Sequence, residues 1–210
     1  MPKKTIKKTP KAAATVSRKT AASKTGVKKA AARSPVAPRK APARATGAAA
    51  KATDPVLVEG KRAPAFRIPR DDGSSVALKD FAGRKLVLFF YPRAGTPGCT
   101  IEANDFSRLA PQFERRGAAV LGVSADPQAA LQRFRAKNNL KVALASDETL
   151  AMLEAYGVWA EKSLYGKTFM GVVRTTVLID EDGRVMRVWR NVKVPGHAEA
   201  VLSTIRDALS

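Results

Sequence analysis

The feature that most constrains the fold is an apolar segment at residues 86–90, which is followed by a turn and then by a helical pattern. The run LVLFF is typical of a buried strand, and the PRAGTPG that comes soon after it holds two prolines and two glycines that end a strand. The helical pattern begins near Gly98. A core strand that turns directly into a helix is the start of a β–α unit, and it favours an α/β fold.

Strands and helices alternate in the same way farther along the chain. Further strands are predicted at residues 66–69, 75–78, 118–124, 142–145, 175–180 and 184–190. Helices are predicted from Gly98, from Asp126-Pro127 to about Lys137, from Asp147 to Gly157, and over residues 197–209. The order predicts a parallel core closed by an antiparallel hairpin, which is an α/β sandwich.

Three local signals set finer expectations for these helices. Pro111 falls inside the first helical pattern and is expected to kink or split it near Ala110. Asp126 is expected to be the N-cap of the second helix, with Pro127 at its first position. Asp147 is expected to cap the third helix.

The positive charge is concentrated at the N-terminus. Residues 1–53 contain 11 lysines, 4 arginines and no acidic residue, so they carry +15 of the net charge of +20. They also contain no aromatic residue. Such a segment cannot bury enough apolar surface to fold, so we expect a disordered basic tail at 1–53 and a folded domain at 54–210.

The low counts of cysteine and histidine exclude several classes of protein. One cysteine cannot form an internal disulfide framework or a Cys-rich metal site, and one histidine leaves little for haem or zinc. We therefore expect no metal and no cofactor. No apolar run approaches 18 residues and the N-terminus lacks a signal-peptide pattern, so we expect no membrane association and a cytoplasmic, reducing location.

The only cysteine, Cys99, is predicted in the first turn of a helix just after a core strand. Unpaired N–H groups and the helix dipole favour an anion there, and the thiolate is the reactive form of cysteine. A lone cysteine is more often a buried packing residue. The Thr-Pro-Gly-Cys setting favours a nucleophile instead.

Residues 92–99, PRAGTPGC, resemble the PxxxTxxC active-site pattern of the peroxiredoxins. The wider FFYPRAGTPGCT is similar to the bacterioferritin-comigratory, or Q-type, branch, and so is WAEKSLYGKTFMGVVRTTVLIDEDG at residues 159–183. The resemblance covers about residues 57–210 and excludes the tail. It implies a thioredoxin-like sandwich, with a central mixed sheet flanked by helices, and a thiol-dependent peroxidase. It also implies that Cys99 is the peroxidatic cysteine and that Arg174 is the active-site arginine.

The residue types fit those roles. Thr96 can turn its hydroxyl toward the sulfur and a peroxide oxygen, although a simple N-cap role is the alternative. Arg174 offers a permanent cation with fixed donors, although it could also be a surface arginine at a strand end. Pro92, without an N–H, can wall the pocket against water. His197 is expected to be a surface residue at a helix start.

The position at which many Q-type members carry a resolving cysteine, five residues after the peroxidatic one, is Asn104 here. With one cysteine in the chain, an intramolecular disulfide cannot form. The sulfenate must be reduced by an external thiol, which could be thioredoxin, glutaredoxin or a low-molecular-weight thiol. The sequence predicts a one-cysteine cycle that reduces hydrogen peroxide and organic hydroperoxides.

The tail resembles the Lys/Ala/Pro-rich tails of linker histones and bacterial histone-like proteins, which implies non-specific DNA binding by counterion release. The candidate contact residues are Lys3, Lys4, Lys7, Lys8, Lys11, Lys28 and Lys29. A solubilising tail or an organelle-targeting peptide are alternatives. A second interpretation of the whole chain is a nucleoid or chromatin-associated DNA-binding protein that uses the folded domain as a redox sensor or scaffold, with a nucleoid or nuclear location.

Overall fold

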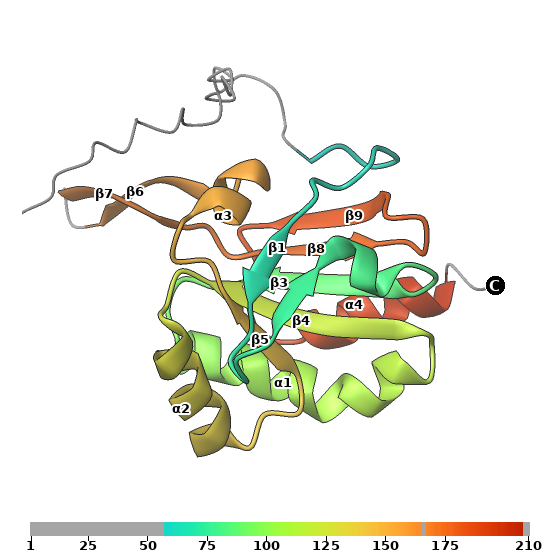
Figure 1. The fold of residues 1–210 in the computed structure, drawn as a ribbon, viewed down its shortest axis with the longest axis horizontal. Coiled ribbons are helices and arrows are strands. Elements are labelled where there is room, and N and C mark those ends of the chain that lie inside the picture. The colour runs from blue at the N-terminus through green and yellow to red at the C-terminus, as the bar shows by residue number, and fades with distance from the viewer. Residues whose placement is uncertain (1–56, 165–166, 208–210) are drawn as a thin grey trace, which may run out of the picture. The chain divides into compact units, whose positions relative to one another are not determined.

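The computed structural model describes residues 57–164 and 167–207, and the tail predicted at 1–53 lies outside them. A five-stranded sheet in the order β5-β4-β3-β8-β9 forms the centre of this part (Figure 1). Its strands are β3 (Lys85–Phe90), β4 (Ala118–Ser124), β5 (Ala143–Ser146), β8 (Thr175–Ile179) and β9 (Val185–Arg190). β3, β4 and β5 are parallel, whereas β8 pairs antiparallel with both β3 and β9. The predicted parallel core closed by an antiparallel hairpin is confirmed.

The remaining elements cover or extend this sheet. The helices are α1 (Pro97–Glu114), α2 (Gln128–Asn138), α3 (Ala151–Ala155) and α4 (His197–Asp207), together with the short 3-10 helix η1 (Leu78–Phe81). Two small antiparallel sheets are β1 (Arg67–Pro69) with β2 (Ser75–Ala77), and β6 (Trp159–Leu164) with β7 (Lys167–Val172). None of the helices in the described part of the chain is long and apolar enough to cross a membrane.

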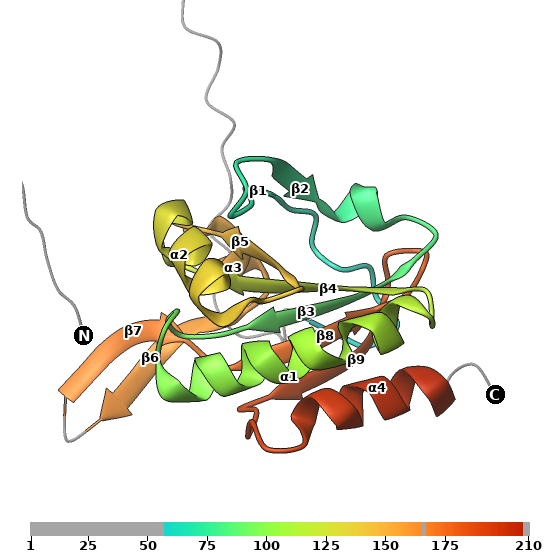
Figure 2. The same ribbon diagram turned by 90° about the horizontal axis from the view of Figure 1, so that it is seen from below.

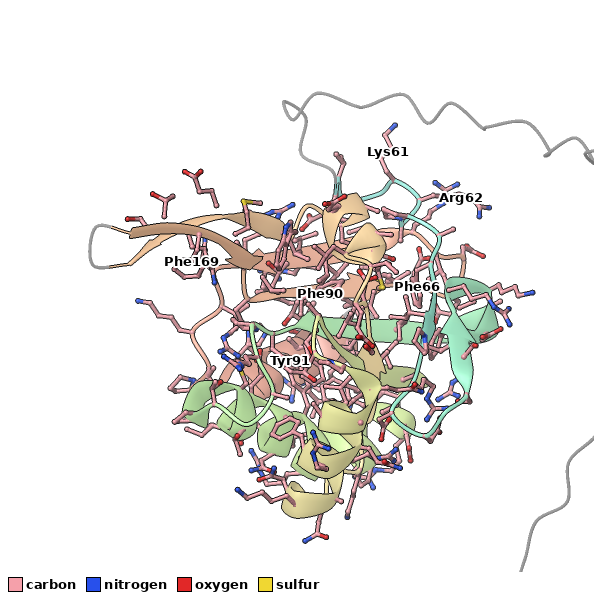
Figure 3. All side chains as sticks on the ribbon, turned by 60° about the vertical axis from the view of Figure 1, so that its left-hand side comes forward. Lys61, Arg62, Phe66, Phe90, Tyr91 and Phe169 are labelled. Atoms are coloured by element: carbon pink, nitrogen blue, oxygen red, sulfur yellow. The ribbon has the colours of Figure 1, made fainter. Side chains whose placement is uncertain are left out.

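The central strand β3 is buried along its whole length, and its side chains alternate between two cores. Val87 and Phe89 face a cluster that also holds Cys99 and apolar residues of α1, α2 and α4. Leu86 and Phe90 face a second cluster under α3 and the β1–β2 sheet. Figure 2 shows α1 and α4 together on one side of the sheet. In Figure 3, Phe66 and Phe90 lie on one side of the sheet and Tyr91 on the other. The loop after β3, and α1 beyond it, therefore start from a strand that is buried at every residue.

The local expectations for the helices are only partly confirmed. α1 is one continuous helix through Pro111, so the expected split does not occur. Pro111 lies in the last turn, where the loss of its N–H leaves the bonds of the preceding turns intact. The N-cap of α2 is Pro127 rather than Asp126. The third helix covers only Ala151–Ala155, which is shorter than expected, and its N-cap position is Leu150. The Asp147 carboxylate still accepts from the Leu153 N–H in the first turn of this helix, at 2.9 Å.

Candidate active site

Cys99 lies in the first turn of α1, directly beyond the loop that leaves β3. Thr96 is the N-cap residue and Pro97 opens the helix, which preorganises the turn. Cys99 is a free cysteine with 1% of its surface exposed. The positive end of the helix dipole favours a thiolate at this position. So do the N–H groups of the first turn, which have no acceptor within the helix.

Arg174, in the short link between β7 and β8, lies against this turn. Its Nη2 donates a hydrogen bond to Cys99 Sγ at 3.3 Å. A Cβ on Gly98 would stand 3.4 Å from the same Nη2, so glycine at this position leaves the guanidinium room to approach the helix. The structure thus brings together two residues that are 75 positions apart in the sequence, a thiol and a permanent cation.

Glu102 is a third member of the site that sequence reasoning missed. Its Oε2 accepts a hydrogen bond from Arg174 Nη1, and its side chain is 1% exposed. Its Oε1 has no hydrogen-bond partner among the described residues. Burial outweighs the attraction of Arg174 and raises the pKa of Glu102 to about 7. The signal that could have found it is the i, i+3 spacing from Cys99, which places both on one face of a helix.

Thr96 and Pro92 lie in the loop that precedes α1. The Thr96 hydroxyl donates to the Arg93 carbonyl at 3.0 Å, so its proton is not directed at the sulfur in this state. Although Thr96 holds the N-cap position, its side chain makes no capping hydrogen bond. Pro92 is exposed at the start of the loop. Their expected roles at the peroxide stay predictions.

Asp126 ties the loop to the end of β4. Its Oδ2 accepts from the Ala94 N–H at 2.7 Å and from the Ser124 hydroxyl at 2.9 Å. This is the structural reason why Asp126 does not cap α2. The carboxylate that sequence analysis assigned to a helix instead fixes the loop that positions Cys99.

Lys162 supplies a second cation from β6. Its Nζ donates to the Val172 carbonyl at 2.6 Å, two residues before Arg174. Burial and the nearby Arg174 cation lower the pKa of Lys162, while Cys99 acts in the opposite direction. The β6–β7 hairpin, which was not predicted from the residue pattern, therefore contributes charge to the surroundings of the thiol.

The expectation of a surface position for His197 is wrong. His197 is 8% exposed, its Nε2 lies 2.8 Å from the Thr176 hydroxyl, and its ring packs edge-on against Phe106 and Trp189. Burial, with a smaller contribution from the Arg174 cation, lowers its pKa to about 4. His197 is therefore a neutral packing residue near neutral pH.

The remaining expectations concern Asn104 and the lysines of the tail. Asn104, at the position expected for a resolving cysteine, is exposed on α1. The seven lysines proposed for nucleic-acid binding lie outside the described residues. Within residues 57–164 and 167–207, no three His, Cys, Asp or Glu side chains gather closely enough to hold a metal ion.

Replacing Glu102 with glutamine tests whether this carboxyl titrates inside the fold. The ordinary glutamate pKa is 4.5, and that of Glu102 is about 7. Between these values the folded protein holds a proton that the unfolded chain has lost, so this group's contribution to stability falls as pH rises. We expect the wild type to lose on the order of 1–3 kcal/mol relative to Glu102→Gln between pH 5 and pH 8, as measured by urea denaturation.

The exposed Glu114, on the same helix, provides the control. The difference in unfolding free energy between Glu114→Gln and the wild type should not change with pH over this range. A flat difference for Glu102→Gln as well would contradict a buried, titrating carboxyl.

Comparisons with known proteins agree with this geometry. A model described as the AhpC/TSA family matches residues 59–188. Peroxiredoxin Bcp of Bacillus subtilis is 41% identical over 148 residues, which are 70% of this chain and 94% of that protein. Peroxiredoxin Bcp of Escherichia coli is 40% identical over 151 residues, which are 72% of this chain and 97% of that protein.

A solved structure of the Xanthomonas campestris bacterioferritin comigratory protein has a similar fold. It is described as a trapped intermediate/ligand complex that bears on alkyl peroxide reduction activity. Its sequence identity with this chain is 38% and its TM-score is 0.69, and the match covers 73% of this chain and 100% of the other. The described part of the chain therefore has a thioredoxin-like α/β fold.

Proposed function

Because the chain belongs to the AhpC/TSA family, as a Bcp-type peroxiredoxin and thiol peroxidase, we propose that Cys99 alone carries its cycle and that an external thiol closes it. The observation that supports this most is the hydrogen bond from Arg174 Nη2 to Cys99 Sγ, 3.3 Å long, at a helix N-terminus. A cation and a helix dipole that act on one sulfur favour the thiolate that attacks a peroxide.

In the oxidative half of the cycle, the Cys99 thiolate attacks the terminal oxygen of hydrogen peroxide or an organic hydroperoxide. A sulfur–oxygen bond forms and the oxygen–oxygen bond breaks, which leaves a sulfenic acid on Cys99. The other oxygen departs as hydroxide or alkoxide and takes up a proton to give water or an alcohol. Arg174 stabilises both the thiolate and the developing negative charge on the departing oxygen.

The supporting residues act on this same centre. Glu102 orients the Arg174 guanidinium through Nη1, which leaves Nη2 aimed at the sulfur. We propose that Thr96 rotates from the Arg93 carbonyl to contact the peroxide, and that Pro92 limits access of water. Because Cys99 is 1% exposed, a thiol larger than the peroxide reaches its sulfur only after the first turn of α1 opens.

In the reductive half, a thiol from another molecule attacks the sulfenic sulfur. A mixed disulfide forms and the sulfenic oxygen leaves as water, after which a second thiol releases Cys99. The chain contains no second cysteine that could take this role. A thioredoxin, a glutaredoxin or a low-molecular-weight thiol could supply the attacking group, and a reducing cytoplasm is the location that suits this chemistry.

Oxidation of the full chain with one equivalent of peroxide is expected to give a sulfenic acid on Cys99. Dimedone should trap it on nearly every chain, because no internal thiol competes for it. Excess peroxide should drive the same residue to sulfinic or sulfonic acid. Intact-mass measurement distinguishes these products, and a rapid, quantitative Cys99–Cys99 dimer would contradict the one-cysteine cycle.

A second proposal concerns residues 1–53, and the concentration of charge there supports it. With +15 in 53 residues against +5 in the rest, the tail can neutralise phosphates of duplex DNA without reading their sequence. The absence of aromatic residues in the tail disfavours base stacking. The tail then keeps the peroxidase close to DNA.

Deleting residues 1–53 is expected to abolish salt-dependent DNA binding and to leave peroxidase turnover nearly unchanged. If about half of the tail cations contact phosphates, the log–log salt slope of the full chain is roughly −6 to −7. Gel-shift titrations of both proteins at several salt concentrations measure it. Equal affinity of the two proteins for DNA would show that the tail is not the binding element. DNA binding without peroxidase turnover would favour the sensor or scaffold interpretation.

A further inference from the structure

A basic hollow of about 450 Å³ lies between the loop before α1 and the helix α2. Its loop side is lined by Arg93, Ala94 and Gly95, and its α2 side includes Arg133 and Lys137. The volume lies in the range of pockets that hold small molecules, which is roughly 300–1,000 Å³. Nothing in the peroxidase chemistry described above uses this hollow.

The fold does not account for three of the cations that line the hollow. Arg93, Arg133 and Lys137 are exposed, and none makes a side-chain hydrogen bond or ion pair with another described residue. Arg133 and Lys137 are four residues apart on α2, so two like charges share one face, which costs the helix a little stability. In contrast, Arg135 of the same helix pairs with Asp71 at 3.0 Å. Folding therefore accounts for Arg135 and leaves the other two unexplained.

The single carboxylate that lines the hollow does not cancel these charges. Asp126 Oδ2 is already committed to the Ala94 N–H and to the Ser124 hydroxyl. The lining of the hollow keeps three cations against one anion, so a ligand with two carboxylates would complement it.

The hollow adjoins the turn that carries the reactive sulfur. Thr100, the residue after Cys99, lines it, and so does Gly95 on the other side of the N-cap. The Thr100 hydroxyl donates to the Thr96 carbonyl at 2.8 Å within this turn. A molecule held in the hollow therefore lies beside the segment that has to open before a bulky thiol reaches Cys99.

We propose that this hollow binds the carboxylates of a small anionic thiol, a peptide thiol with two carboxylates, and so delivers the reductant to oxidised Cys99. The inference rests on the external-thiol cycle proposed above and specifies the chemical class of its reductant. The bound thiol attacks the sulfenic sulfur, a disulfide bond forms, and the sulfenic oxygen leaves as water. Arg93, Arg133 and Lys137 act only on the anionic groups of the reductant, and the peroxide step does not involve them.

The test separates the two halves of the cycle in the full-length protein. Cys99 is first oxidised with one equivalent of peroxide, and the sulfenate is then mixed in a stopped-flow instrument with glutathione, with uncharged 2-mercaptoethanol or with reduced thioredoxin. For the double variant Arg133→Gln/Lys137→Gln we expect the rate constant with glutathione to fall roughly 5- to 20-fold, and less at high salt. The rate with 2-mercaptoethanol, and the rate of oxidation by peroxide, should stay within about twofold of the wild type.

The matched control removes the same two residue types elsewhere. Lys79 and Arg84 are both exposed and lie away from the hollow, so Lys79→Gln/Arg84→Gln should behave as the wild type with every thiol. An unchanged glutathione rate in the Arg133/Lys137 variant would overturn the proposal. So would an equal loss with both thiols, or a loss seen only with reduced thioredoxin, which would point to a protein reductant. If the wild-type sulfenate reacts with none of these thiols, the proposed cycle itself fails, which is a distinguishable result.

Discussion

Cys99→Ser is expected to lose peroxide reduction by at least about 10⁴-fold, because a serine hydroxyl is not ionised near neutral pH and the chain has no second cysteine. The site around it should survive, since serine is close in size to cysteine and its hydroxyl can still accept from Arg174. Peroxide consumption with an excess of dithiothreitol measures the activity, and circular dichroism checks the fold.

A second variant keeps this result interpretable. Cys99→Ala removes the polar atom altogether, and it should be as inactive as Cys99→Ser. If either variant kept more than a few per cent of the wild-type turnover, Cys99 would not be the nucleophile.

Arg174→Ala is expected to slow the reaction with peroxide by about 10²- to 10³-fold, the usual cost of removing a donor that stabilises transition-state charge. The rate of Cys99 alkylation at a fixed, neutral pH should also fall, because the sulfur loses the cation that donates to it at 3.3 Å. Arg174→Lys should recover only part of the rate, since one ammonium cannot hold both Cys99 and Glu102 in the fork geometry of arginine.

Two controls isolate the effect at the sulfur. Arg84→Ala removes an exposed arginine elsewhere and should leave both measurements unchanged. The double variant Arg174→Ala/Glu102→Gln does not leave the Glu102 carboxyl buried without its partner. Its reaction with peroxide should be as slow as that of Arg174→Ala. Recovery of the wild-type rate in this double variant would show that the loss came from the orphaned Glu102 rather than from the missing cation.

The central part of the fold could be predicted because its signals are local. The apolar run in β3, the Pro- and Gly-rich loop after it and the helical spacing of Phe106, Leu109 and Phe113 all lie within about 30 residues of one another. β4 was predicted with its observed bounds, Ala118–Ser124. Alternating strands and helices then leave few arrangements of a sheet, and the observed one is among them.

The errors at Asp126 and His197 have a different origin, since each depends on a contact with a distant segment. Asp126 is drawn from the expected helix cap by the Ala94 N–H, 32 residues away in the chain. His197 is buried because Thr176, in β8, offers a hydroxyl inside the core. A pattern read along one element cannot register such partners.

In the candidate site, too, local signals could be predicted and contacts between distant segments could not. The surroundings of Cys99 predicted its place at a helix start, whereas Arg174 came from a family resemblance rather than from spacing. Glu102 could have been found from its helical spacing to Cys99. Lys162 could not, because its nearness to the site depends on the pairing of β6 with β7 (Figure 1). The sequence carries no strong turn signal for this hairpin.

The most direct test of the central claim is the mass of the full-length protein during turnover. The chain is mixed with ten equivalents of hydrogen peroxide and an excess of a monothiol, quenched with an alkylating reagent at intervals, and measured intact without reduction. We expect all of the peroxide to be consumed while no disulfide links two chains, with Cys99 passing between the free thiol, the sulfenic acid and a mixed disulfide with the added thiol. Peroxide consumption that stops near half an equivalent per chain, with a disulfide-linked dimer as the end product, would contradict it.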